Sequence, residues 1–419
     1  MGDVILLCTV GGSKEPIIRA IEHYRPSRTV FVCSSGPRSS RAQVEGDGGI
    51  VEEKGLPEGA WEILEVPPDD PDTAFVEIEK RIVDLSSRNS GRIIVDYTGG
   101  TKSMSVAAAL AALAAGVELS LTTGERRDLV KVASGTERAT PVGFRGVMAR
   151  FALDRAADAW RRFAYGDAAE LLERAFRDLT LAGESGESVR KLRQRLQRLL
   201  AASRMFEAWD RFAHRDALFR MKESRLANNL SGMQRYEQAL TILTSDTPEP
   251  LMLWDLWLNA ERRARRKRYD DALARLYRLV EWTAQFILRT ERGIDTAHFD
   301  PTVLPEGELR DRLAARAGGK GRTTIGLFDA LEVAQALVSE HPFVRPLRTA
   351  LGGSMPLSEL QQWIEARNRS ILAHGFTPVD ETLWQRAHGW MQRHWVPWIH
   401  DELAARSQDL PQFPTQFPD

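Results

Sequence analysis

The chain has 419 residues, and its 57 basic and 58 acidic side chains leave a formal net charge of -1. Hydrophobic residues make up 43% and charged residues 27%, which is ordinary globular usage and excludes a largely disordered chain. This length predicts two or three domains, each with its own core. The balanced charge argues against a protein coated in basic groups for duplex DNA, although it is compatible with a small basic site.

The cysteine content and the hydropathy of the chain indicate in which cellular compartment the protein is expected. The only cysteines, Cys8 and Cys33, each lie inside an apolar run, which favours buried free thiols over a secreted disulfide scaffold. No apolar run reaches the roughly 18 residues that a membrane helix needs. The first apolar run, residues 4–10, is typical of a β-strand rather than a signal peptide. We therefore expect a cytoplasmic protein with no membrane partner.

The first 145 residues alternate strand and helix patterns. Strand patterns occur at residues 4–10, 29–33, 61–66, 92–97, 117–122 and 129–133, of which the last two form a predicted hairpin. Helix patterns between these strands end at Tyr24, Arg88 and Gly116. Strands that alternate with helices indicate a mostly parallel sheet, so the expected fold is α/β and Rossmann-like.

From about residue 144 the strand patterns stop, and Leu, Ala, Arg and Glu recur at helical spacing to the C-terminus. Two prolines within residues 244–250 break any helix there and mark the best linker. We expect an α/β domain at residues 1–145, an all-α connector at 146–247 and a second all-α domain at 248–419. The proline-containing tail from Leu410 is expected to be an extended end.

A first motif, residues 96–104, reads Asp-Tyr-Thr-Gly-Gly-Thr-Lys-Ser-Met and lies where a strand gives way to a helix. Glycines let a ligand approach the backbone, helix N-terminal amides favour an anion, and Lys102 adds a positive charge. The spacing is neither Walker A nor Gly-x-Gly-x-x-Gly, which argues against nucleoside triphosphate hydrolysis and dinucleotide redox chemistry. Taken alone, the motif is equally compatible with a plain strand-to-helix turn.

A second glycine loop, after the first predicted strand, changes that balance. Both loops follow parallel strands and therefore lie at the carboxyl edge of the sheet, where open α/β sheets bind ligands. Two such loops facing one crevice suit a ligand with phosphodiester groups. The predicted ligand-binding residues are Gly11, Gly12, Ser13, Thr98, Gly99, Gly100, Thr101 and Lys102.

Another motif, residues 365–375, reads Glu-Ala-Arg-Asn-Arg-Ser-Ile-Leu-Ala-His-Gly. On a continuous helix, Arg367 and His374 project within about 20° of each other, whereas Arg369 and His374 diverge by about 140°. This geometry ranks Arg367 above Arg369 as the partner of His374. Gly375 is expected to end the helix and to leave His374 accessible near its end.

These residue types have a shared chemistry. A guanidinium binds a phosphodiester, an imidazole moves a proton near neutral pH, and Asn368 can orient either group. The alternative interpretation is an exposed helix with salt-bridged arginines and an ordinary surface histidine. Two further patterns are interpreted structurally: the basic run 262–268 as a solvated helix face, and four tryptophans as core residues, namely Trp384, Trp390, Trp395 and Trp398.

The Thr-Gly-Gly-Thr-Lys-Ser-Met loop after a strand, with Arg-Asn, five residues and His-Gly near the C-terminus, resembles the CARF–HEPN ribonucleases of type III CRISPR systems. The resemblance covers most of the chain, with CARF at residues 1–145 and HEPN from about residue 250. It implies a homodimer whose paired CARF domains bind a cyclic oligoadenylate, which activates RNA cleavage by paired HEPN domains. By motif position Arg367, Asn368 and His374 are the nuclease residues, and Arg369 is the alternative arginine.

We therefore expect a cyclic-oligoadenylate-activated, metal-independent endoribonuclease that cleaves single-stranded RNA in antiviral defence. The RNA 2′-hydroxyl attacks the adjacent phosphorus to give a 2′,3′-cyclic phosphate, while Arg367 stabilises the phosphorane and His374 transfers or orients a proton. Two-fold symmetry favours an even-numbered activator, cyclic tetra-adenylate slightly ahead of cyclic hexa-adenylate. Ligand in the CARF crevice is expected to control the HEPN domains allosterically through the connector.

No metal or other cofactor is expected, because His388, His394 and His400 lack the spacing of a helical zinc site. Two other functions stay open. One is a nucleotide-sensing regulatory protein whose helical module binds a partner without catalysis. The other is a small-molecule enzyme at the α/β crevice, which is weaker because that crevice shows no evident acid–base pair. Burial of His374 in the core would favour the regulatory protein.

Overall fold

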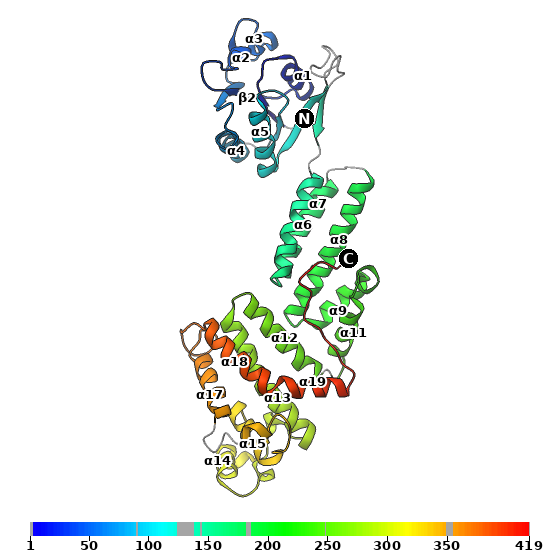
Figure 1. The fold of residues 1–419 in the computed structure, drawn as a ribbon, viewed down its shortest axis with the longest axis vertical. Helices are drawn as coiled ribbons and strands as arrows, with labels where there is room; N and C mark the ends of the chain where they lie inside the picture. The colour runs from blue at the N-terminus through cyan, green and yellow to red at the C-terminus, as the bar shows by residue number, and fades with distance from the viewer. Residues whose placement is uncertain are drawn as a thin grey trace. The chain divides into compact units, whose positions relative to one another are not determined.

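The computed structural model describes residues 3–88, 91–123, 138–142, 145–181, 186–247, 249–348 and 355–418 (Figure 1). It divides into two compact units, which we describe separately. The α/β unit comprises Met1–Arg150 and Asp178–Val189, and the helical unit comprises Phe151–Arg177 and Arg190–Asp419. The predicted strand at residues 129–133 lies outside the described residues.

A six-stranded sheet forms the centre of the α/β unit, with the strand order β3-β2-β1-β4-β5-β6. The first five strands pair in parallel, and β6 is antiparallel to β5. Val, Ile and Leu dominate the central strands because helices cover both faces of the sheet. The strands are β1 (Val4–Thr9), β2 (Arg28–Ser34), β3 (Trp61–Val66), β4 (Arg92–Asp96), β5 (Glu118–Thr123) and β6 (Arg138–Val142).

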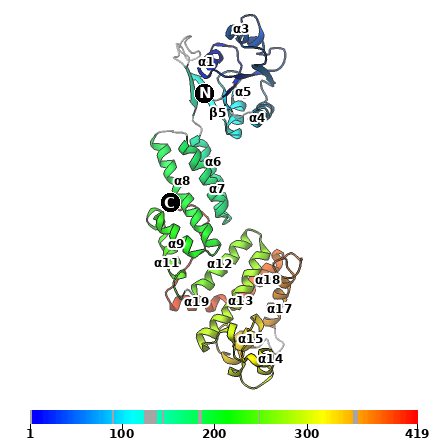
Figure 2. The same ribbon diagram turned by 180° about the vertical axis from the view of Figure 1, so that it is seen from behind.

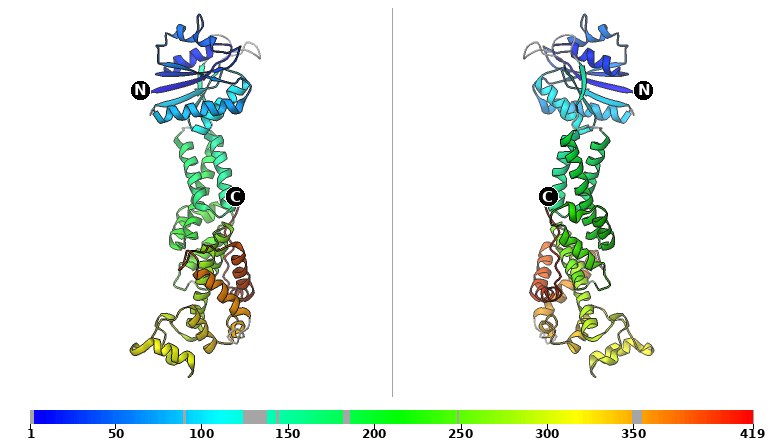
Figure 3. Two further views of the ribbon diagram at one scale, coloured as in Figure 1. Left: turned by 90° about the vertical axis from the view of Figure 1, so that its left-hand side faces the viewer. Right: turned by 90° about the vertical axis from the view of Figure 1, so that its right-hand side faces the viewer.

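Helices pack on both faces of this sheet (Figure 3). One face carries α1 (Glu15–Tyr24), α2 (Ala42–Glu45) and α3 (Ile50–Lys54), and the other carries α4 (Pro71–Arg88) and α5 (Lys102–Ala115). Both cysteines are free thiols buried on the α1 side, as the sequence predicts. Burial raises the pKa of Cys33 to about 11, so this thiol stays protonated at neutral pH.

The order in which the chain adds strands to the sheet reverses at β1, so that β1 and β4 are parallel neighbours although they are far apart in sequence. The loops after two such strands lie at the carboxyl edge of the sheet, the position at which open α/β sheets have their ligand-binding crevice. The two glycine loops predicted to bind a ligand follow β1 and β4. The sheet therefore places them side by side.

The helical unit holds α6 (Arg145–Arg161) from residue 151 onward and the helices that follow it. The expected fold class, a Rossmann-like α/β region followed by an all-α region, is confirmed. Within the described ranges every helix is too short or too polar to cross a bilayer. The remaining elements are α7 (Tyr165–Leu181), α8 (Glu187–Asp210), α9 (His214–Glu223), α10 (Leu226–Asn229), α11 (Gln234–Leu243), α12 (Leu251–Arg265), α13 (Tyr269–Arg292), η1 (Thr296–His298), η2 (Pro301–Val303), α14 (Glu308–Ala317), η3 (Gly318–Lys320), α15 (Leu327–Leu337), α16 (Arg345–Arg348), α17 (Met355–Asn368), α18 (Glu381–His394) and α19 (Val396–Ala405).

The C-terminal tryptophans pack in the core of the helical unit, as predicted. Trp390 and Trp395 are fully buried, and Trp384 and Trp398 nearly so. The indole Nε1 of Trp395 donates a hydrogen bond to Thr283 Oγ1 of α13 at 2.8 Å, which satisfies its one polar atom inside the core. These rings join α18 and α19 to the long helix α13.

The tail from Leu410 is extended, as expected, but it is not a free end. It runs back along the helical unit past α19, toward α8 and α11 (Figures 1 and 2). Leu410 and Phe413 are buried. Tyr165 donates a hydrogen bond to the Pro414 carbonyl at 2.8 Å, and Tyr236 donates one to the Gln412 carbonyl at 2.9 Å. The tail is therefore part of the fold that holds these helices together.

The basic run 262–268 is not a solvated face at its start, which corrects the expectation. Arg262 is fully buried, and its guanidinium lies 3.7 Å from the centre of the Phe413 ring. Its Nε donates to Asp210 Oδ1 at 2.8 Å, and its Nη2 lies 3.5 Å from Asp255 Oδ1. The partners that bury Arg262 come from α8 and the C-terminal tail as well as from its own helix, so the run alone did not reveal them.

We expect Arg262→Ala to destabilise the helical unit by about 3–5 kcal/mol, because it leaves Asp255 buried without an arginine partner and Asp210 paired only with Arg263. Scanning calorimetry of the full chain checks this through the melting transition of the helical unit. Arg268→Ala, in the exposed part of the same run, is the matched control and is expected to change stability by less than about 0.5 kcal/mol. Equal melting temperatures for the two variants would contradict a stabilising role of the buried cluster.

Candidate functional site

The loops after β1 and β4 touch through their backbones. A Cβ atom on Gly99 would lie 2.2 Å from the Thr9 carbonyl oxygen, and one on Gly11 would lie 2.8 Å from the Gly100 amide nitrogen. Gly100 also has a φ of +81°, a left-handed conformation that favours glycine. The glycines are therefore required by the close approach of the two loops. The structure brings the two predicted loops into close contact at one edge of the sheet.

Side chains also fix the carbonyl oxygen of Gly99. Thr9 Oγ1 and Ser105 Oγ donate hydrogen bonds to it at 2.7 and 2.9 Å. A free carbonyl oxygen in this loop would repel a phosphate, and these two donors occupy it. The arrangement leaves the loop suited to an anionic ligand.

Asp96, at the end of β4, is a positioning residue that the sequence analysis did not single out. Its Oδ1 accepts the Thr98 backbone N–H at 3.1 Å, and its Oδ2 accepts the Ser120 hydroxyl at 2.8 Å. Burial raises the pKa of this carboxyl group. An aspartate that accepts a hydrogen bond from the backbone N–H two residues later forms an Asx-turn. The sequence Asp-Tyr-Thr before two glycines could have predicted this turn. Asp96 holds the start of the β4 loop in place.

The charge of the crevice comes from the start of α5. Thr101 caps this helix, accepting the Met104 backbone N–H at 3.2 Å. Lys102 follows as the first helical residue; it is exposed, and no carboxylate of the described residues pairs with it. On the opposite loop Gly12 and Ser13 are exposed. A capped helix N-terminus, an unpaired lysine and open backbone are groups that can bind an anion at this edge of the sheet.

The second motif differs from the sequence prediction. The helix α17 ends at Asn368, and residues 369–374 form turns rather than two more helical turns. The His374 backbone N–H donates to the Asn368 carbonyl at 3.1 Å, so the chain folds back to the end of the helix. The expectation of one helix through His374 is wrong. The ranking of Arg367 above Arg369 from helical projection loses its basis.

Gly375 makes this return possible. A Cβ atom there would lie 2.1 Å from the Arg369 carbonyl oxygen, closer than any side chain can approach. The same carbonyl accepts the Thr377 backbone N–H at 3.0 Å, which closes the loop. Gly375 is thus required by the tight turn and not by a helix end at His374. We call residues 369–377 the return loop.

Side-chain contacts rank the two arginines in a different way. The Arg367 guanidinium lies 4.3 Å from the centre of the Tyr277 ring of α13, and its Nη1 donates to Asn368 Oδ1 at 3.2 Å. Arg369 is exposed, and its side chain has no partner among the described residues. A guanidinium held in place before substrate arrives is better placed for catalysis than a free one. Tyr277 gave no signal in the sequence.

His374 is exposed at the end of the return loop, and Asn368 is exposed beside Arg367. The loop therefore brings the backbone of His374 back to Asn368, which is next to Arg367 in sequence and accepts a hydrogen bond from it. A guanidinium, an amide and an imidazole are groups that can bind a phosphodiester and move a proton. Among the described residues no group of three or more His, Cys, Asp or Glu side chains is arranged to hold a metal ion.

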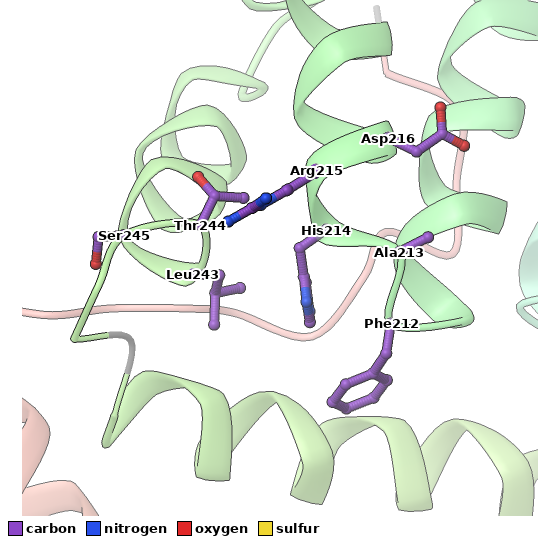
Figure 4. A pocket seen from close by; sticks show the side chains of 8 residues that line it. All are labelled: Phe212, Ala213, His214, Arg215, Asp216, Leu243, Thr244 and Ser245. Atoms are coloured by element: carbon purple, nitrogen blue, oxygen red, sulfur yellow. The ribbon is translucent and has the colours of Figure 1, made fainter.

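A cavity of about 420 Å³ lies elsewhere in the helical unit, between the start of α9 and the end of α11 (Figure 4). His214 lines it, but this histidine is engaged: its Nε2 lies 2.8 Å from Asp255 Oδ2, inside the cluster around Arg262. No residue of either motif lines the cavity. Its lining residues are Phe212, Ala213, His214, Arg215, Asp216, Leu243, Thr244 and Ser245.

Comparisons with known proteins address the fold of the chain and the family that its C-terminal part resembles. Residues 244–394 match the family model described as the Csm6 HEPN domain, and this segment contains the whole return loop. The fold of the chain is similar to that of the solved structure "Enterococcus italicus Csm6 bound to cyclic hexa-2′-fluoro-hexa-dAMP", with a TM-score of 0.55 and 13% identity over 95% of each chain. The HEPN match and this fold support the resemblance of the chain to the CARF–HEPN proteins.

Another solved structure is "Can2 from Sulfobacillus thermosulfidooxidans in complex with cyclic tetra-adenylate", with 12% identity, coverage of 52% of this chain and 68% of that one, and a TM-score of 0.26. A TM-score of this size does not establish a shared fold. The comparison with curated proteins gave no match. The return loop lies within the part of the chain that matches the HEPN model, and the two glycine loops lie in the α/β unit outside that match.

Proposed function

We propose that this CARF–HEPN protein is a cytoplasmic endoribonuclease of CRISPR antiviral defence that a cyclic oligoadenylate activates and that needs no metal. The CARF domain is assigned to residues 1–145, the connector to 146–247 and the HEPN ribonuclease domain to 248–419. One observation carries the proposal: the segment that matches the Csm6 HEPN domain contains Arg367, Asn368 and His374. In this segment His374 is exposed and its backbone is hydrogen-bonded to Asn368, and the Arg367 guanidinium is held against the Tyr277 ring. The exposure of His374 favours the nuclease over a non-catalytic regulatory module.

In the proposed reaction the 2′-oxygen of a ribose attacks the adjacent phosphorus. A new P–O2′ bond forms and the P–O5′ bond breaks, which gives a 2′,3′-cyclic phosphate and a 5′-hydroxyl. The proton of the 2′-hydroxyl must leave and the departing 5′-oxygen must gain one, and an imidazole can do either. Arg367 opposes the charge of the phosphorane, and Asn368 orients the guanidinium. A two-fold homodimer supplies a second His374, so that one removes a proton while the other delivers one.

Ligand binding is proposed at the carboxyl edge of the sheet, between the loops after β1 and β4. The residues proposed to bind the ligand are Gly11, Gly12, Ser13, Thr98, Gly99, Gly100, Thr101 and Lys102. The structurally similar Csm6 is bound to a six-membered ring. Two-fold symmetry admits both four- and six-membered rings and disfavours a three-membered one. We retain cyclic tetra-adenylate as the first candidate and cyclic hexa-adenylate as the second.

We expect cleavage of a fluorescent single-stranded RNA to rise at least about 10-fold with one of these two rings, in EDTA as well as without it, because the site uses no metal. The assay compares cyclic tri-, tetra- and hexa-adenylate at equal concentrations. Products are checked by mass for the cyclic phosphate end. Cleavage that EDTA abolishes would refute metal independence, and no cleavage with any ring would favour the regulatory protein.

A further inference from the structure

Phe376, two residues after His374, is almost fully in solvent. Its side chain is 92% exposed, the highest fraction of any large hydrophobic side chain in the described part of the chain. Ile371 and Leu372 of the same loop are 67% and 49% exposed. Burial of a phenylalanine side chain normally stabilises a fold by about 1.5–3 kcal/mol. The exposed Phe376 side chain contributes none of this free energy to the fold, so its ring is free to contact another molecule.

The backbone that presents this ring is fixed. The Ser370 N–H donates to the Arg367 carbonyl at 2.9 Å, and the Thr377 N–H donates to the Arg369 carbonyl at 3.0 Å on either side of the loop. Beyond it the Val379 N–H donates to Asp270 Oδ1 of α13 at 3.2 Å. Phe376 therefore projects from a constrained loop, which lowers the entropy cost of a contact with its ring.

The charge of the return loop indicates which kind of molecule contacts the Phe376 ring. Residues 366–379 contain Arg367, Arg369 and His374 and no carboxylate. A second copy of the chain brings the same cations, so two such loops at one site need an anion between them. A single RNA strand brings phosphates for the arginines and bases for the ring. Basic groups interleaved with an exposed aromatic ring are the usual platform for single-stranded nucleic acid.

We propose that Phe376 stacks on a base of single-stranded RNA beside the scissile phosphodiester. This rests on the proposed ribonuclease function and adds a residue that fixes which base lies next to the bond that breaks. The arginines then hold the strand at a phosphate and Phe376 holds it at a base. His374 lies between these residues in the sequence. Stacking tolerates every base and is stronger for purines, so Phe376 favours a purine at the stacked position.

The experiment uses full-length protein carrying His374→Ala, which prevents cleavage, and a single-stranded RNA containing 2-aminopurine, whose fluorescence falls when it stacks. Phe376→Ala is expected to weaken RNA binding about 10-fold and to abolish the quenching. Phe376→Tyr keeps both because it keeps the ring, and Phe376→Leu loses both although it stays apolar. Phe219→Ala, a 63% exposed phenylalanine on α9, is the matched control and leaves binding unchanged.

Three results overturn the inference: no RNA binding, no effect of Phe376→Ala, or full binding by Phe376→Leu. Dissociation of a dimer by Phe376→Ala, measured by light scattering and rescued by Phe376→Leu, would instead identify the ring as a contact with a second copy. A protein that binds and quenches the RNA through Phe376, but whose His374-containing form cleaves no RNA with any cyclic oligoadenylate, would support the stacking and refute the nuclease.

Discussion

His374→Ala is expected to reduce activator-dependent RNA cleavage by about 100- to 10,000-fold, because the variant loses the group that moves a proton in the transition state. Arg367→Ala is expected to lose about 100- to 1,000-fold, since it removes the guanidinium that faces the phosphorane. Single-turnover cleavage with saturating activator measures both. RNA binding is expected to persist in His374→Ala and to weaken in Arg367→Ala.

Two further variants sharpen this test. Arg369→Ala is expected to lose less activity than Arg367→Ala, because only Arg367 is preset against Tyr277 and Asn368. His298→Ala, with a side chain 71% exposed in another part of the helical unit, controls for loss of a surface imidazole and should be fully active. If Arg369→Ala were the inactive variant, the catalytic arginine would be Arg369 and not Arg367. Full activity of both His374→Ala and Arg367→Ala would place catalysis elsewhere.

The α/β region was predictable because its signals are local. Short runs of Val, Ile and Leu end in glycine, and a parallel sheet places all such ends at one edge. The approach of Gly11 to Gly100 follows from that topology. Asp96 was missed although it stands in the motif itself, because the motif was analysed for its glycines, Lys102 and helix start and not for a side chain that accepts backbone hydrogen bonds.

The helical unit was less predictable, since its decisive contacts join residues far apart in sequence. Arg262 looks like one of several surface arginines until Asp210 of α8 and Phe413 of the tail enclose it. The end of α17 at Asn368 was missed because Ser370, Ile371, Leu372 and Ala373 do not prohibit a helix. Only Gly375 hinted at a turn, and it was assigned to the wrong helix end. Periodicity finds helices, but tertiary hydrogen bonds decide where this one stops.

Lys102→Glu is expected to raise the concentration of cyclic oligoadenylate needed for half-maximal activation by at least about 100-fold. A charge-assisted hydrogen bond to a phosphate contributes roughly 1.5–3 kcal/mol, and the substitution replaces it with repulsion. In a two-fold dimer each ring meets this change twice, so the loss is compounded. Calorimetry with cyclic tetra- and hexa-adenylate measures the affinity directly.

The proposed ligand site and the return loop are separate sites, so substitutions in them are expected to impair different steps: ligand binding in one case and RNA cleavage in the other. Lys102→Glu is expected to keep the basal cleavage seen without activator, whereas His374→Ala loses it and still binds the ring. Lys80→Glu is the matched control: it reverses an exposed lysine on α4 of the same unit and should leave affinity unchanged. An equal loss in Lys80→Glu would mean that net charge, not the α5 N-terminus, attracts the ligand. A wild-type protein that binds neither ring at micromolar concentration would refute the sensor assignment, whatever the return loop does to RNA.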